Sequence, residues 1–174
     1  MNLKKLVRIS VLCAIAVVLV YLIHFPIIPG VTFLEYDPAD ISIIFIGLMY
    51  GTGWGLGATA IVSIIQGLTV SAASGPIGII MHIIATGVCV TTVSLIHKKT
   101  GKLFPALAFG AVAMVLIMIP VNLIFTGIFM GTGVQTVVKM LIPAIIPFNA
   151  VKAGINLLVA GVLYKKLGKT MNKD

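Results

Sequence analysis

Charged side chains are scarce in this chain. Only 9% of its 174 residues are Asp, Glu, Lys or Arg, against about 25% in an ordinary soluble domain. The hydrophobic set supplies 60% of the residues, and the mean hydropathy is +1.21. A soluble globule with so few charges could not cover its surface with polar groups, and a disordered chain requires low hydrophobicity. The composition therefore predicts an all-α integral membrane protein.

Acidic residues are too few and too clustered for most catalytic sites. Three of the four acids lie within residues 35–40, so they cannot form a carboxylate pair drawn from separate elements. No Walker lysine motif is present, so we expect no ATP hydrolysis by this chain. A nucleophile–base pair could only combine Ser71 or Ser74 with His82, and no G-x-S-x-G elbow surrounds either serine. The sequence predicts a protein that is not an enzyme.

Cysteine is nearly absent, which limits redox and metal chemistry. Cys13 and Cys89 lie in different apolar runs, where a free cysteine behaves as a small hydrophobic residue. Their spacing predicts neither a disulfide nor a metal site. We expect no metal and no resident cofactor.

The net charge of +8 comes from basic residues at the edges of apolar runs. This distribution follows the positive-inside rule, which places Lys and Arg on the cytoplasmic side of a membrane. A nucleic-acid surface would instead gather them on one exposed face among aromatic residues, so no nucleic-acid partner is expected. The three clusters are Lys4, Lys5 and Arg8; Lys98, Lys99 and Lys102; and Lys165, Lys166, Lys169 and Lys173.

The apolar runs predict one membrane domain, residues 1–174, built as a bundle of six transmembrane helices. The predicted spans are about 3–23, 39–50, 56–70, 77–96, 103–125 and 142–167. Residues 24–37 are expected to form a loop, and residues 126–139 a glycine-rich interfacial stretch. The first run lacks a small-residue cleavage pattern, so we expect a retained span rather than a signal peptide.

Six spans with both termini in the cytoplasm place all three basic clusters on one side and the acidic stretch outside. Spans 39–50 and 56–70 are short, so an alternative merges them into one kinked helix. That alternative puts the second and third clusters on the face opposite the first, which the positive-inside rule disfavours.

Lys152 is an ionisable residue deep in the last span, and such a residue is a functional hypothesis by default. Asn149 and Asn156 lie three and four residues away, so the three side chains share one helical stripe. Asn122 in the fifth span is the nearest comparable polar group. One interpretation is a substrate site. The other is that Lys152 extends to the interface or pairs with an acid of residues 35–40.

Four other residues have simpler interpretations. His82 and Gln66 are lone polar residues in apolar spans and are expected to hydrogen-bond between helices. Tyr50 and Trp54 fit an aromatic belt at the membrane interface.

Three motifs resemble those of the substrate-binding S components of energy-coupling factor (ECF) vitamin transporters, most closely the riboflavin-specific group. They are Phe33-Leu-Glu-Tyr-Asp-Pro-Ala-Asp-Ile41, Gly75-Pro-Ile-Gly78 and Ile146-Pro-Phe-Asn-Ala-Val-Lys152. The resemblance extends over nearly the whole chain and includes the six-span count and the cytoplasmic termini.

The resemblance implies a binding pocket near the outer face, with the loop between the first two spans as its lid. The implied substrate-binding residues are Asn149, Lys152, Asn122, Leu34, Glu35, Tyr36 and Asp40. Ser10 and Ala14 match an Ala-x-x-x-Ala stripe through which family members dock on an energising module. That module consists of a membrane coupling subunit and two ATPases, which alone use ATP. The location implied is the cell membrane of a bacterium, in contact with lipid.

The implied ligand is riboflavin, whose flat ring needs apolar walls and whose ribityl chain needs hydrogen-bonding groups. Lys152 paired with a lid acid would favour a neutral ligand, whereas an unpaired Lys152 would favour an anionic vitamin such as pantothenate, biotin or a folate. A membrane assembly subunit that binds no small molecule is the alternative from another functional class.

Overall fold

The protein is described here by a computed structural model that covers residues 3–31 and 33–171. Lys173 of the C-terminal basic cluster, and Asp174, lie outside the described residues. In chain order the elements are α1 (Leu3–Leu22), β1 (Phe25–Pro26), β2 (Glu35–Tyr36), α2 (Ala39–Tyr50), α3 (Thr52–Leu68), the 3-10 turn η1 (Ala72–Ser74), α4 (Gly75–Thr100), α5 (Leu103–Met130), α6 (Val134–Met140), the π-helical turn η2 (Leu141–Ile145) and α7 (Ile146–Met171).

Four helical stretches of the described chain are long and apolar enough to cross a membrane. They are Leu3–Leu22, Ala72–Thr100, Leu103–Met130 and Val134–Gly168. The helices α2 and α3 are apolar but have only 12 and 17 residues. At a rise of about 1.5 Å per residue, α2 is only about 18 Å long, against a hydrocarbon core of about 30 Å. The predicted second span is therefore a short helix inside the bundle.

The chain reverses between α2 and α3 at Gly51. This glycine has φ of 93°, a value that residues with a Cβ rarely adopt. After the turn, α3 packs back against α2, so the two segments are separate helices rather than one kinked helix. Ten of the twelve residues of α2 are buried, and α2 packs against α1, α3, α4 and α7.

Two hydrophobic cores lie on either side of α2. Ile44 and Leu48 pack into a core with α4, α5 and α7, which also contains Cys89. Ile43 faces a second core with α1 and α3, which contains Cys13. Both cysteines are free and buried, as expected for small hydrophobic residues. The helical spacing of apolar residues thus lets one short helix serve both cores.

The expected glycine-rich stretch at residues 126–139 is largely helical, which corrects the sequence-based boundary. The helix α5 continues to Met130 and therefore includes Gly127. Gly131 then ends α5 in the left-handed conformation, with φ of 62°, and α6 begins at Val134. Two of the glycines therefore have different tasks, one inside a helix and one as its C-terminal cap.

Two prolines near the last predicted span do not interrupt the helix. Pro143 lies in the π-helical turn η2, and such turns accommodate a local break in the hydrogen-bond pattern. Pro147 is the second residue of α7 and directly follows this turn, so the altered hydrogen-bond pattern there also accommodates its missing N–H. The helical path is therefore continuous from α6 to α7, and longer than the predicted 142–167.

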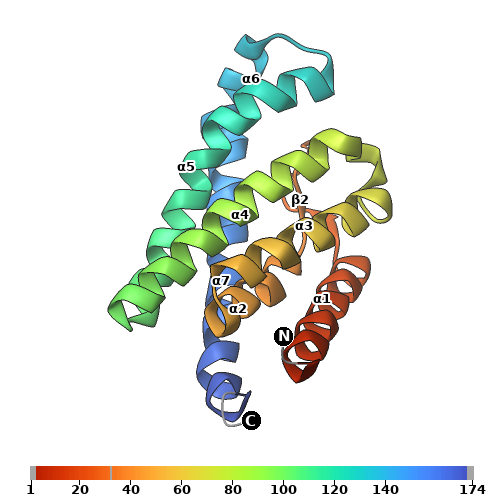
Figure 1. Cartoon of the computed structure of the whole chain (residues 1–174). Coiled ribbons are helices and arrows are strands. Elements are labelled where there is room, and N and C mark those ends of the chain that lie inside the picture. Colours follow the sequence, from red (N-terminus) through yellow and green to blue (C-terminus); the bar gives the residue numbers. More distant parts are fainter. Residues whose placement is uncertain (1–2, 32, 172–174) are drawn as a thin grey trace.

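The ends of the bundle differ in charge. Figure 1 shows the two chain termini and the α4–α5 turn in the lower half of the view. The beginning of α1, the end of α4 and the end of α7 carry the three basic clusters. The upper half of the view contains α6, the α3–α4 turn and β2, which belongs to the loop between α1 and α2 (Figure 1).

Replacement of Gly47 by Val should destabilise the fold, because α2 and α4 approach closely there. A Cβ at Gly47 would overlap Val90 Cγ2 and lie 2.7 Å from Ser94 Oγ. Overpacking of this kind costs about 1–3 kcal/mol. We expect Gly47→Val to lower the Tm measured by circular dichroism in detergent. Gly57→Val is the matched control, because a Cβ at Gly57 meets no atom within 4 Å. Equal Tm values for the two variants would contradict the close approach.

Candidate functional site

A cavity lies at the end of the bundle that carries the loop between α1 and α2. Its walls come from that loop, α3, the α3–α4 turn, α4, α5 and the beginning of α7. One part of the lining is apolar and is formed by Phe33, Ile77, Ile79, Met81, Ala85, Met114, Met118, Phe129 and Phe148. The polar part includes Ser63, Gln66, Ser71, Ser74, His82, Asn122, Thr126, Asn149 and Lys152. This mixture suits a ligand with an apolar body and several hydrogen-bonding groups.

Short antiparallel pairing holds the loop in place. Phe25 pairs with Tyr36 and Pro26 with Glu35, so β1 and β2 bring the two ends of the loop together. His24 Nε2 then lies 2.8 Å from Glu35 Oε2. Both side chains line the cavity, and their pairing holds the two ends of the loop together beside it.

The loop is also bonded to α7. The Tyr36 hydroxyl donates a hydrogen bond of 2.9 Å to Asn156 Oδ1, and Asn156 Nδ2 donates one of 3.1 Å to the carbonyl oxygen of Asp37. Burial raises the pKa of the Tyr36 phenol, and the negative charge of Asp37 raises it further. Tyr36 therefore remains a neutral donor. The polar stripe predicted on the last span is used in part to bind the loop.

An ion pair connects the loop and α7 inside the protein. Lys152 Nζ lies 2.7 Å from Asp37 Oδ2 and 4.0 Å from Asp40 Oδ2. Asp37 Oδ1 also accepts the backbone N–H of Ala39 at 3.2 Å, an Asx-type bond at the start of α2. The sequence left open whether Lys152 reaches the interface or pairs with an acid, and the structure pairs it with Asp37.

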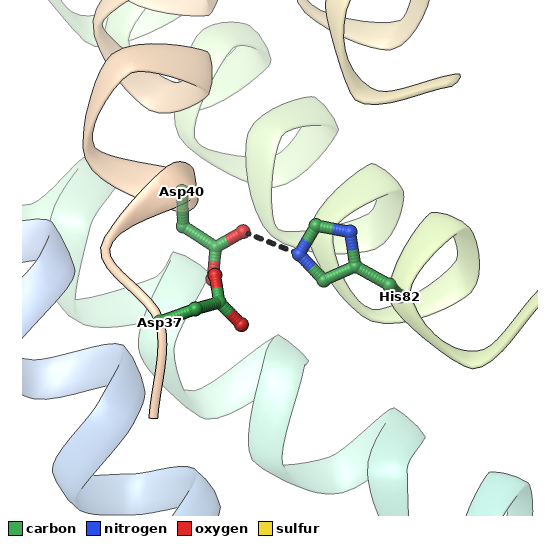
Figure 2. A group of neighbouring side chains, drawn as sticks. All are labelled: Asp37, Asp40 and His82. Carbon is green, nitrogen blue, oxygen red and sulfur yellow. Dashed lines mark ion pairs between the residues drawn. The ribbon is translucent and has the colours of Figure 1, made fainter. Parts of the chain in front are cut away.

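Asp40 is the centre of a second set of contacts. His82 Nε2 lies 3.2 Å from Asp40 Oδ1, as Figure 2 shows for this pair beside Asp37. Thr86 donates a hydrogen bond of 2.6 Å to Asp40 Oδ1, and Asn156 donates one of 3.3 Å to Asp40 Oδ2. Buried charges are tolerated when they are paired and hydrogen-bonded in this way.

The side chains of Asp37, Asp40 and His82 carry the kinds of atom that bind metal ions in proteins. One ligand atom from each of Asp37, Asp40 and His82 lies within 4.8 Å of the others. The Lys152 ammonium, however, is already 2.7 Å from an Asp37 oxygen, and it would repel a divalent ion at that position. We therefore interpret these three residues, together with Lys152, as an ion-pair cluster, which we call the Asp37–Lys152 cluster.

Five of the seven predicted site residues line the cavity, namely Leu34, Glu35, Asn122, Asn149 and Lys152. Tyr36 and Asp40 do not belong to the lining. Tyr36 instead bonds the loop to α7, and Asp40 is a member of the ion-pair cluster.

The two predicted asparagines are oriented by their own helices. Asn149 Nδ2 donates to the carbonyl oxygen of Ile145 at 2.8 Å. Asn122 Nδ2 donates to the carbonyl oxygen of Met118 at 2.7 Å, and its Oδ1 accepts the Thr126 hydroxyl at 2.8 Å. Hydrogen bonds within the helices thus fix the orientation of both asparagine side chains.

Sequence reasoning missed part of the lining. Asp37 was considered only as one of three acids that could pair with Lys152, and nothing in the sequence distinguished it. His82 and Gln66 were expected to hydrogen-bond between helices. His82 Nδ1 does so, at 2.7 Å from Ser63 Oγ of α3, yet both residues also line the cavity. The loop residue His24 gave no signal beyond its place before a proline-rich segment.

The predicted docking stripe lies on the outside of the molecule. Ser10 and Ala14 are exposed, whereas Ile9, Cys13 and Ala16 of the same helix are buried. The stripe is therefore accessible to lipid or to another protein.

Lys152→Met should destabilise the protein strongly, because it leaves Asp37 and Asp40 as buried charges without their cation. Breaking a buried ion pair costs about 3–5 kcal/mol, so a clear fall in Tm in detergent is expected. The double variant Lys152→Met with Asp37→Asn should lose less than the sum of the two single losses. Lys139→Met, which removes an exposed lysine of α6, is the control. Additive losses in the double variant would show that the two charges do not interact.

Comparison with known proteins agrees with this architecture. Residues 4–164 match the family model described as "ECF transporter, substrate-specific component". The chain is 28% identical to the riboflavin transporter FmnP of Bacillus subtilis (strain 168), over 96% of this chain and 93% of that protein. A solved structure titled "Structure and mechanism of the S component of a bacterial ECF transporter" superposes with a TM-score of 0.82 at 26% identity, over 97% of both chains.

Family and fold are those of transporter components and not of enzymes. The match extends over most of the chain, from the first basic cluster to the last turns of α7. The chain therefore belongs to the substrate-specific components, or S components, of ECF transporters.

Proposed function

We propose that this S component binds riboflavin at the outer face of a bacterial cell membrane. Release to the inside would be driven by ATP hydrolysis in partner subunits, so the chain itself needs no cofactor. The observation that carries the choice of ligand is the pairing of Lys152 with Asp37 in the cavity. The similarity to a riboflavin transporter over nearly the whole chain supports the same choice.

The charge of the cluster favours a neutral ligand. Lys152 has one carboxylate at 2.7 Å and a second at 4.0 Å, so its positive charge is already compensated. An anionic vitamin such as pantothenate, biotin or a folate would have to break this pairing or face the two acids. Riboflavin carries no charge and meets no such penalty.

The walls of the cavity are chemically suited to a flavin. The methionines and phenylalanines offer an apolar surface for a flat ring, and sulfur–aromatic contacts are favourable. Asn149 donates its Nδ2–H to the helix backbone, and its Oδ1 accepts no hydrogen bond from the described residues. That oxygen can accept a hydrogen bond from the ligand.

The distribution of charge supports an orientation for the molecule. The end of the bundle that carries the basic clusters (Figure 1) is placed in the cytoplasm by the positive-inside rule. The cavity lies toward the opposite end, among the loop, the α3–α4 turn and the beginning of α7. Substrate would therefore enter from outside, with both termini inside and six helices in the membrane domain.

The exposed stripe of Ser10 and Ala14 is proposed as the surface that docks on the membrane coupling subunit. Small side chains let two helices approach closely. A serine in place of alanine adds one oxygen and leaves such packing open.

Riboflavin binding tests the ligand and the site together. The purified protein should quench flavin fluorescence with saturation near one ligand per chain. Asn149→Ala should weaken binding by about 1–3 kcal/mol, or roughly 5- to 150-fold, because a polar contact in a buried site is lost. Val151→Ala, an exposed position on the same helix, should leave affinity unchanged. Absence of quenching by the unaltered chain would remove riboflavin and direct the search to other vitamins or to an assembly role.

Ala14→Trp should separate binding from transport. The bulky side chain should weaken docking by about 1–3 kcal/mol, while the cavity is left intact. Cells that express the chain with an energising module should then take up riboflavin roughly tenfold more slowly, with unchanged affinity of the purified protein. Ala108→Trp, on the exposed face of α5, controls for bulk in the membrane. Normal uptake by Ala14→Trp would rule out this docking surface.

A further inference from the structure

Gln66 lines the cavity from α3 and has an unused acceptor. Its side chain is buried, with 7% of the residue exposed. Its Nε2 donates a long hydrogen bond of 3.4 Å to Ser71 Oγ. Its Oε1 is buried and has no hydrogen-bond partner among the described residues. A buried carbonyl oxygen without a partner is rare and destabilising, and it requires an explanation.

The surroundings of Gln66 are rich in neutral hydroxyl groups. Ser63, Ser71 and Ser74 line the same cavity from α3 and the α3–α4 turn. The ionisable groups on this side lie beside one another, since His82 Nε2 is 3.2 Å from Asp40 Oδ1 and His24 Nε2 is 2.8 Å from Glu35 Oε2. The chemistry left for a ligand here is therefore uncharged hydrogen bonding.

We propose that Gln66 is a substrate-specificity residue whose Oε1 accepts a hydrogen bond from a hydroxyl group on a polyhydroxylated chain of the ligand. This inference rests on the proposed function and adds α3 to the binding site. Hydroxyl groups both donate and accept, so such a chain can bond to Gln66 and to the neighbouring serines. The terminal torsion of a glutamine has a broad energy minimum, and the long bond to Ser71 lets the amide turn to meet the ligand.

The test compares two flavins that differ in the hydroxyl chain. Riboflavin carries a ribityl chain, whereas lumiflavin has the same ring system with a methyl group in its place. Gln66→Met keeps the size of the side chain and removes its polar atoms. Riboflavin should bind this variant about tenfold more weakly, and lumiflavin should bind it as it binds the unaltered chain. Gln135→Met, at an exposed glutamine of α6, should bind both flavins normally.

Other outcomes overturn the proposal in distinguishable ways. Unchanged riboflavin affinity in Gln66→Met would overturn it while leaving the proposed function intact. An equal loss for both flavins, in a variant with normal circular dichroism, would place the contact on the ring and overturn the assignment to the hydroxyl chain. Failure of the unaltered chain to bind either flavin would overturn the proposed function itself.

A measurement on the unaltered chain covers the case in which Gln66→Met does not fold. If the hydroxyl chain is recognised by Gln66 and the serines, lumiflavin must bind the unaltered protein at least about tenfold more weakly than riboflavin. Equal affinities of the two flavins would overturn the proposal without any variant.

Discussion

The pairing of Lys152 with Asp37 is the interaction on which much of this structure depends. An unpaired ammonium or carboxylate in an apolar bundle is costly, so each residue needs the other. Lys152 belongs to α7, and Asp37 lies directly before α2. Their contact therefore fixes where the loop after α1 meets the last helix. The bonds from Tyr36 and Asn156 strengthen the same junction, and the cavity forms beside it.

The same junction explains how a site can be polar without being strongly charged. The two aspartates lie beside Lys152 and His82, so their negative charge is compensated in part within the protein. The uncharged polar groups of the cavity include hydroxyl and amide side chains on α3, α5 and α7, at positions fixed by hydrogen bonds within their helices. Such groups select by geometry and by the number of donors and acceptors rather than by charge.

The sequence predicted the elements more completely than the contacts between them. Apolar run length and charge placement indicated a helical membrane bundle and the approximate extent of α2, because both depend on local composition. The extent of α5 was missed, because the sequence does not distinguish a glycine within a helix, such as Gly127, from a glycine that ends one. The sequence left the partner of Lys152 open for another reason. Three acids lie within six residues, and only the register of the loop against α7 decides that Asp37 is the nearest. The unused oxygen of Gln66 likewise depends on side-chain geometry.

The position of α2 has a consequence for how the molecule unfolds. The two hydrophobic cores have no buried residue in common, yet each includes residues of α2. Unfolding of this helix would expose apolar surface in both cores at once. Neither core is then expected to remain folded without the other. The helices that form these two cores should therefore unfold as one cooperative unit. The helix α2, the shortest in these two cores and too short to cross the bilayer by itself, is the element that confers this cooperativity.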